Sequence, residues 1–101
     1  MSRRLKFSQI LKERLGSDNV YFQPPASKKI DYPAIIYKRQ DFDTKIADDE
    51  LYGAVTCYMV TVIDPDPDSE IPGKILELPM CRFSRHYTAN NLNHDVFSVY
   101  Y

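Results

Sequence analysis

The stretch that decides the fold is Met80 to Tyr101, MCRFSRHYTANNLNHDVFSVYY, at the end of a chain of 101 residues. Two runs of aromatic and β-branched residues flank a pair of Asn residues, a pattern typical of a strand, a turn and a second strand. Asn tolerates the positive φ of a tight turn better than any residue except Gly. We therefore expect a β-hairpin here.

The register of this hairpin decides which side chains share a face, because a slip of one residue moves every side chain to the opposite face. An even loop would place His86 opposite Asp95 and form a His–Asp dyad. An odd loop, Asn90–Leu92, would gather the apolar residues of both strands on one face. We predict the odd loop, because the even one would send Phe83 and Phe97 to opposite sides of the sheet.

The first half of the chain predicts one helix and one short strand. Apolar residues at helical spacing indicate an amphipathic helix over Arg3–Leu15, with Gly16 placed to end it. A short strand follows at Val20–Gln23 and stops at Pro24 and Pro25, since proline cannot donate to a strand ladder. The apolar stripe of the helix consists of Phe7, Ile10, Leu11 and Leu15.

Two long strands and a second helix are predicted in the middle of the chain. The first strand begins at Ile35 and turns polar along its length, the acidic residues 46–50 form a hairpin loop, and the second strand runs over Leu51–Ile63. A helix is expected over Glu70–Leu78, capped by Asp68 or Ser69 and followed by Pro79, with Ile71, Ile75, Leu76 and Leu78 as its apolar side.

Both faces of the second long strand are apolar enough to be buried, unlike a strand with one solvated side. One face carries Leu51, Val55, Cys57, Met59 and Ile63, and the other carries Tyr52, Tyr58, Val60 and Val62. Because two helices can cover only one face of the sheet, we expect another subunit to cover the second face.

These elements predict a single α+β domain over residues 1–101. The expected fold is an antiparallel sheet of four to five strands with two short helices packed on one face, in the order α-β-β-β-α-β-β. A net charge of −1 and 44% hydrophobic residues are those of an ordinary globular protein. The charged N-terminal stretch does not follow a signal-peptide pattern, so we expect a protein made in a cytosol or an assembly built there.

Little in the sequence points to catalysis. Cys81, His86 and either Asn90 or Asp95 could form a thiol triad, but the predicted register separates His86 from Asp95. Cys81 is expected on the core side, where thiols are unreactive. Both Cys57 and Cys81 are expected to be reduced and buried. We therefore predict that the protein is not an enzyme and has no catalytic residue.

No cofactor or metal is expected either. Asp64–Ser69 alternates acids as a calcium loop does, but an EF-hand needs Gly where Ser69 stands and Glu where Ile75 stands. The Cys and His residues lack zinc-site spacing, and the three Gly residues form no phosphate-binding loop. Acidic loops at 41–50 and 64–70 oppose the basic first helix, so no sequence-specific nucleic acid partner is expected.

Residues 32–101 carry several motifs in a characteristic order. YPAIIYKRQDFDTKIADDELY, then DPDSEIP, then RHYTANNLNHDVFSVYY, with FQPP preceding them, resemble the small tail-completion proteins of tailed bacteriophages and prophages. The chain departs from that pattern at Asn90, where Asp is usual, and at Gly73, where a charged residue is usual.

The resemblance implies a tail terminator, also called a tail-to-head joining protein. Such a protein forms a ring, usually a hexamer, on the last ring of the tail tube and presents a surface to the head connector. The implied partners are copies of itself, the tail tube protein and a head–tail connector or adaptor. The implied location is the neck of a virion assembled in the host cytoplasm. A head-completion protein is the alternative within the same class, and a small thiol hydrolase is the alternative of another class.

Ring formation through head-to-tail contacts requires two different complementary surfaces on each subunit. We predict that the long central hairpin forms one of them, because it is expected to project and carries charges of both signs. The residues predicted at this interface are Arg39, Asp41, Asp43, Lys45, Asp48, Asp49, Glu50 and Tyr58.

Overall fold

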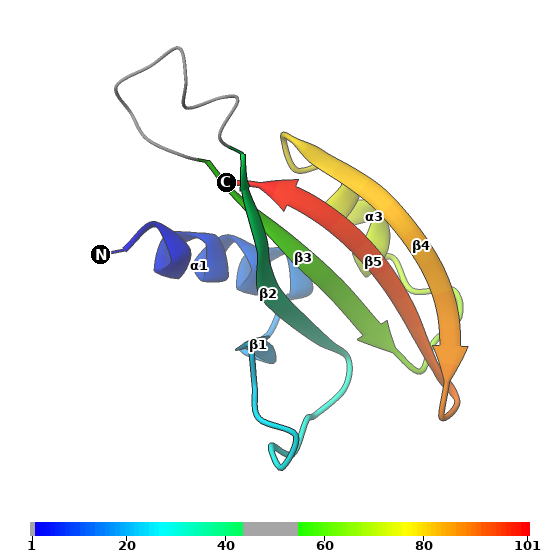
Figure 1. Ribbon diagram of the computed structural model, residues 1–101. Helices are drawn as coiled ribbons and strands as arrows, with labels where there is room; N and C mark the ends of the chain where they lie inside the picture. Colours follow the sequence, from blue (N-terminus) through cyan, green and yellow to red (C-terminus); the bar gives the residue numbers. More distant parts are fainter. Residues whose placement is uncertain (1, 44–54) are drawn as a thin grey trace.

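The computed structural model of the protein describes residues 2–43 and 55–101. Its elements follow the predicted order α-β-β-β-α-β-β of an α+β domain (Figure 1). They are α1 (Arg3–Leu15), β1 (Val20–Phe22), β2 (Ala34–Asp43), β3 (Val55–Asp64), α3 (Ile71–Leu76), β4 (Cys81–Ala89) and β5 (Leu92–Tyr100).

The five strands form one sheet in the order β1-β2-β3-β5-β4, which places β3 at its centre. β3 pairs antiparallel with both β2 and β5. The prediction of a wholly antiparallel sheet is wrong at one edge, because β1 pairs with β2 in parallel. The connection over residues 23–33 has the length that a parallel pair needs, since it must return the chain to the end of the sheet where β1 began.

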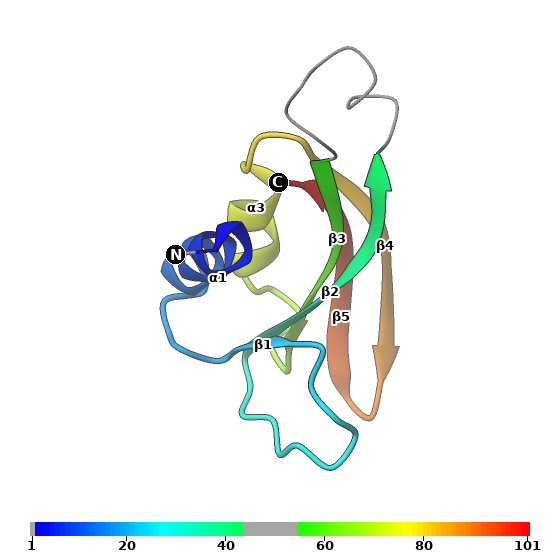
Figure 2. The same ribbon diagram turned by 60° about the vertical axis from the view of Figure 1, so that its left-hand side comes forward.

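Both helices lie on the same face of the sheet, as Figure 2 shows. The bounds of α1 are those predicted from the sequence, and both of its ends are capped. Ser2 Oγ accepts a hydrogen bond from the N–H of Leu5 at 3.2 Å, and Gly16 adopts the left-handed conformation, φ 83°, that ends many helices. α3 is shorter than predicted, and Ser69 Oγ accepts the N–H of Ile71 at its start.

The core between helices and sheet is dominated by aromatic rings. The ring of Phe7 stacks on those of Tyr58 and Tyr101, with centroids 4.9 and 5.0 Å away, and meets Tyr37 edge-on at 5.5 Å. The buried hydroxyl of Tyr37 hydrogen-bonds to Ser8 of α1. Much of the high aromatic content is therefore used to join α1 to the centre of the sheet.

The predicted stripe of α1 is confirmed, since Phe7, Leu11 and Leu15 are buried and Ile10 packs against the same cluster. For α3 the prediction is partly wrong. Ile75 and Leu78 are buried and Ile71 is half-buried, whereas Leu76 is 51% exposed because the short helix turns it away from the sheet.

The predicted two-faced character of β3 is confirmed over its described residues. Tyr58, Val60 and Val62 belong to the core cluster beneath the helices. Cys57, Met59 and Ile63 alternate with them and so face the other way. We call this second side, turned away from α1 and α3, the outer face.

The predicted register of the last hairpin is wrong next to the turn. Ala89 pairs with Leu92, so the loop holds two residues and His86 lies opposite Asp95. Asn90 and Asn91 have φ values of 54° and 62°, and positive φ at both central residues is the geometry of a type I′ turn. This turn matches the twist of the strands, which explains why the shorter loop forms.

The apolar residues are nevertheless gathered, because the register changes within β4. The ladder shifts between Phe83 and Arg85, so Ser84 is an extra residue, and Phe83 pairs with Phe97 beyond it. Their rings meet edge-on with centroids 5.5 Å apart. The β-bulge thus combines the even register at the turn with the gathering of apolar residues on one face that the odd register would also give.

Deleting Ser84 should leave the fold intact. Its removal would make the Phe83–Phe97 and Arg85–Val96 pairs consecutive in one regular ladder, so we expect the free energy of unfolding to change by less than about 1 kcal/mol. Deleting Asn91 is the matched control. It leaves one residue between Ala89 and Leu92, so the two-residue turn is lost and the edge strand β4 must slip against β5, at a cost that we expect to exceed about 1 kcal/mol. Urea denaturation of both variants checks this, and a Ser84 deletion as harmful as the Asn91 deletion would contradict it.

Candidate interaction surfaces

The outer face carries a shallow hollow of about 360 Å³ over β2, β3, β5 and β4. Val96 and Ile63 lie at its floor, with 2% and 6% of their surface exposed, while Ile36 and Met59 are only half-buried. No helix of the described chain covers this side (Figure 2). The hollow is therefore an apolar surface that a partner could cover.

Positive charge and aromatic rings surround this hollow. Lys38 of β2 and Arg85 of β4 line it on either side. The Arg85 guanidinium lies 5.3 Å from the ring centroid of Tyr87, and that ring stacks on His94 with centroids 4.6 Å apart. Arg82, opposite Ser98, adds a third cation to the same face.

The charged side chains described on the outer face are all positive. Among the strand residues of this face whose side chains are described, Lys38, Arg82 and Arg85 are charged and none carries a carboxylate. The surroundings of the hollow are therefore cationic.

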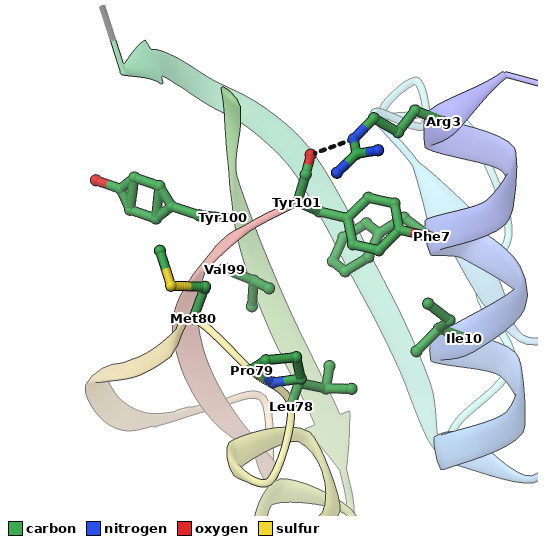
Figure 3. Close-up of a pocket in the computed structure, with 9 residues that line it drawn as sticks. All are labelled: Arg3, Phe7, Ile10, Leu78, Pro79, Met80, Val99, Tyr100 and Tyr101. Atoms are coloured by element: carbon green, nitrogen blue, oxygen red, sulfur yellow. Dashed lines mark hydrogen bonds between the residues drawn. The ribbon is translucent and has the colours of Figure 1, made fainter. Parts of the chain in front are cut away.

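A second surface is a pocket of about 400 Å³ between α1 and the ends of β5 and α3. Figure 3 shows Phe7 and Ile10 of α1 facing Leu78 and Val99 across it. Further lining comes from Pro79, Met80 and Tyr100. Such an apolar, concave surface suits an apolar side chain.

The side chain of Arg3 borders the opening of this pocket on one side. Arg3 Nε donates a hydrogen bond to the Tyr101 carbonyl oxygen at 3.0 Å, and the Arg3 guanidinium lies 4.8 Å from the Tyr101 ring centroid. Met80, on the opposite side, is 63% exposed. The Arg3 contacts join the two ends of the described chain across the pocket.

The structure separates the residues predicted for the interface on the long hairpin. Tyr58 is buried beneath α1, and burial together with nearby Tyr37 raises the pKa of its phenol, so its side chain belongs to the core. Arg39 is exposed on β2, where its N–H donates to Gln23 Oε1 at 3.2 Å. Asp41 and Asp43 lie in the last part of β2. Lys45, Asp48, Asp49 and Glu50 lie outside the described residues.

The His–Asp pair that the predicted register excluded is present. His86 Nδ1 and Asp95 Oδ1 are 2.8 Å apart, with His86 about half exposed. Cys81 lies five positions along β4, about 16 Å away at the rise of an extended strand, which is too far for proton transfer from a thiol. The three residues therefore do not form a thiol triad.

The remaining polar candidates serve as turn and packing residues. The carboxylates of Asp64 and Asp66 accept the N–H groups of Asp66 and Asp68, each at 2.9 Å. Within residues 2–43 and 55–101, no three His, Cys, Asp or Glu side chains gather closely enough to hold a metal ion. Neither of the two cysteines forms a disulfide; Cys57 is buried and Cys81 is half-buried.

Sequence reasoning missed the cationic hollow and the apolar pocket. Lys38 and Arg85 lie on strands that are not adjacent in the sheet, and the pocket joins Phe7 of α1 to Val99 of β5. In the sequence, Ile36 and Lys38 alternate with Ile35 and Tyr37, which are buried. This alternation was the one sequence pattern that could have indicated the cationic hollow. No local pattern could have indicated the apolar pocket.

Comparison with protein-family models, with curated proteins and with solved structures found no match to this chain. Among the described helices, none has both the length and the apolar character needed to span a bilayer.

The Cys81 thiol should react slowly with alkylating agents. Burial raises the pKa of this thiol above 9.0, its ordinary value, so at pH 8 a smaller fraction is thiolate than in an exposed cysteine. In a Cys57→Ser variant, the iodoacetamide reaction should be slower than that of a cysteine peptide at the same pH, and its rate should level off at a higher pH than that of the peptide. A thiolate already formed below pH 7 would contradict this and revive the thiol-hydrolase alternative.

Proposed function

We propose that this protein is a structural component of a phage or phage-derived particle, a tail terminator that assembles as a ring on the tail tube and joins it to the head connector. The observation that carries the proposal is the outer face, where Ile36 and Met59 remain half-exposed above an apolar floor without a covering helix. The resemblance of residues 32–101 to tail-completion proteins supplies the particle and the place within it.

The surfaces favour association over chemistry. The outer hollow and the pocket beneath α1 are apolar, open and on different layers of the molecule. Among the polar candidates described above, Asp64 and Asp66 bond backbone N–H groups of a turn, and His86 and Asp95 form an exposed pair. A protein with two distinct interaction surfaces can contact one neighbour through each surface. A subunit of a ring needs two such surfaces.

A head-completion protein would need the same kind of surface, so it is the second candidate. The two functions differ in which partially assembled particle accumulates when the protein is missing, and that difference can be seen by electron microscopy.

Association should depend on the outer face. A Met59→Glu substitution places a charge beside the apolar floor of the hollow. If a neighbouring subunit covered the hollow, this charge would be buried without a partner, which costs free energy. We expect the variant to stay folded and sediment as a monomer at concentrations where the unchanged protein forms an oligomer. Leu76→Glu, on the exposed side of α3, is the control and should assemble normally. A monomeric unchanged protein, or an assembling Met59→Glu variant, would contradict the role of this face.

Particles made without this protein should show its position in assembly. If it ends tail growth, deleting its gene should give overlong or headless tails together with DNA-filled heads. Micrographs of lysates, with the intact gene supplied from a plasmid as the control, test this. Heads that leak DNA beside tails of normal length would favour head completion, and normal infectious particles would refute both roles.

A further inference from the structure

An acidic loop lies on the side of the molecule opposite the cationic hollow. Residues 64–70, DPDPDSE, connect β3 to α3 and carry four carboxylates, of which Asp66, Asp68 and Glu70 are exposed. The ion pairs formed among the described residues, Arg14–Glu77 and His86–Asp95, involve none of these three. Likewise, neither Lys38 nor Arg85 of the hollow takes part in them.

The acidic loop is held in one shape. The carboxylates of Asp64 and Asp66 accept backbone N–H groups within it, and two prolines restrict its backbone. From β5, Asn93 Nδ2 donates to the carbonyl oxygens of Asp64 and Pro65 at 3.1 and 3.3 Å. A loop that is already ordered loses little conformational entropy when it docks.

The loop cannot reach the hollow of its own chain. Asp64 follows Val62 by two positions on β3 and so leaves the strand on the helix side, where the loop leads into α3. The hollow lies on the other side of the sheet, the side that carries neither α1 nor α3 in Figure 2. Any contact between loop and hollow must therefore join two molecules.

We propose that the cationic hollow of the outer face receives the acidic 64–70 loop of a second copy of this chain. Lys38 and Arg85 would meet the exposed carboxylates, while Pro65 and Pro67 would cover half-buried Met59 and the apolar floor beside it. This inference rests on the proposed self-assembly and names the surfaces that carry it.

Charged and apolar contacts would contribute differently to this interaction. Ion pairs at an exposed rim add little affinity, but they orient the partners and reject wrong pairings. The apolar floor therefore supplies most of the affinity, and the charges select which surface of the neighbour is accepted. Because hollow and loop are different surfaces, the contact is head-to-tail, the type that generates rings.

Charge reversal on each surface tests the pairing. Lys38→Glu with Arg85→Glu makes the hollow acidic, and Asp66→Lys with Asp68→Lys makes the loop basic. Each double variant alone presents like charges to its copies, so we expect its self-association to weaken about tenfold or more in Kd. Lys6→Glu with Lys74→Glu, on the helices, changes the net charge as much as the first variant and should assemble normally.

Mixing the two double variants gives the decisive measurement. In the mixture, the acidic hollow of the first variant can bind the basic loop of the second, and the unchanged hollow of the second can bind the unchanged loop of the first. Alternating assemblies should therefore form at concentrations where neither variant assembles alone. Sedimentation velocity of each variant and of the equimolar mixture measures this. Recovery in the mixture also shows that both variants are folded.

The outcomes separate this inference from the proposed function. If the unchanged protein assembles and the double variants do so equally well, the loop-to-hollow contact is refuted while self-assembly stands. If both variants lose assembly and the mixture does not recover, the pairing is refuted as well. If the unchanged protein shows no assembly even at high concentration, both the loop-to-hollow contact and the proposed ring are refuted.

Discussion

The central strand β3 imposes the constraint on which the rest of the structure depends. It is paired on both edges and apolar on both faces, and the described residues of the chain provide two helices, α1 and α3. α1 and α3 cover one face and build an aromatic core there around Phe7 and Tyr58. The apolar residues of the other face are covered only in part, by Lys38, Arg85 and Tyr87 at the rim of the hollow. The two described helices therefore leave one apolar face of the sheet without a helical layer.

The sequence predicted best those features that local chemistry decides. α1 begins and ends as predicted because its stripe, Ser2 and Gly16 all lie within one segment. The two faces of β3 could be assigned because alternation along a strand needs no knowledge of its neighbours. The parallel pairing of β1 depends on where residues 23–33 return the chain, and no local pattern specifies that.

The hairpin register shows why two sound local arguments can disagree. Asn90 and Asn91 favour a two-residue turn, and the apolar residues favour a register one residue away. The structure satisfies both by placing Ser84 in a bulge. Nothing about a serine between Phe83 and Arg85 marks it as an extra residue, so the sequence could not predict the compromise. The two-residue turn places His86 opposite Asp95, whereas Cys81 lies beyond the bulge. The hollow was missed for a similar reason, since Lys38 and Arg85 meet only when the whole sheet has formed.

The two edges of the sheet are less suited to association than its outer face. β4 is an edge strand, and such strands invite pairing with another chain unless something prevents it. Here the bulge at Ser84 interrupts the ladder, and Arg82 and Arg85 add charge. The other edge, β1, has only three residues and is followed by Pro24 and Pro25. Both edges thus carry the features by which natural sheets avoid edge-to-edge growth. The proposed contact instead uses the apolar hollow on one side of the sheet and the acidic loop on the other. Because these two surfaces lie on opposite sides of one molecule, a pair of molecules would leave one hollow and one loop unused, which favours a series of head-to-tail contacts.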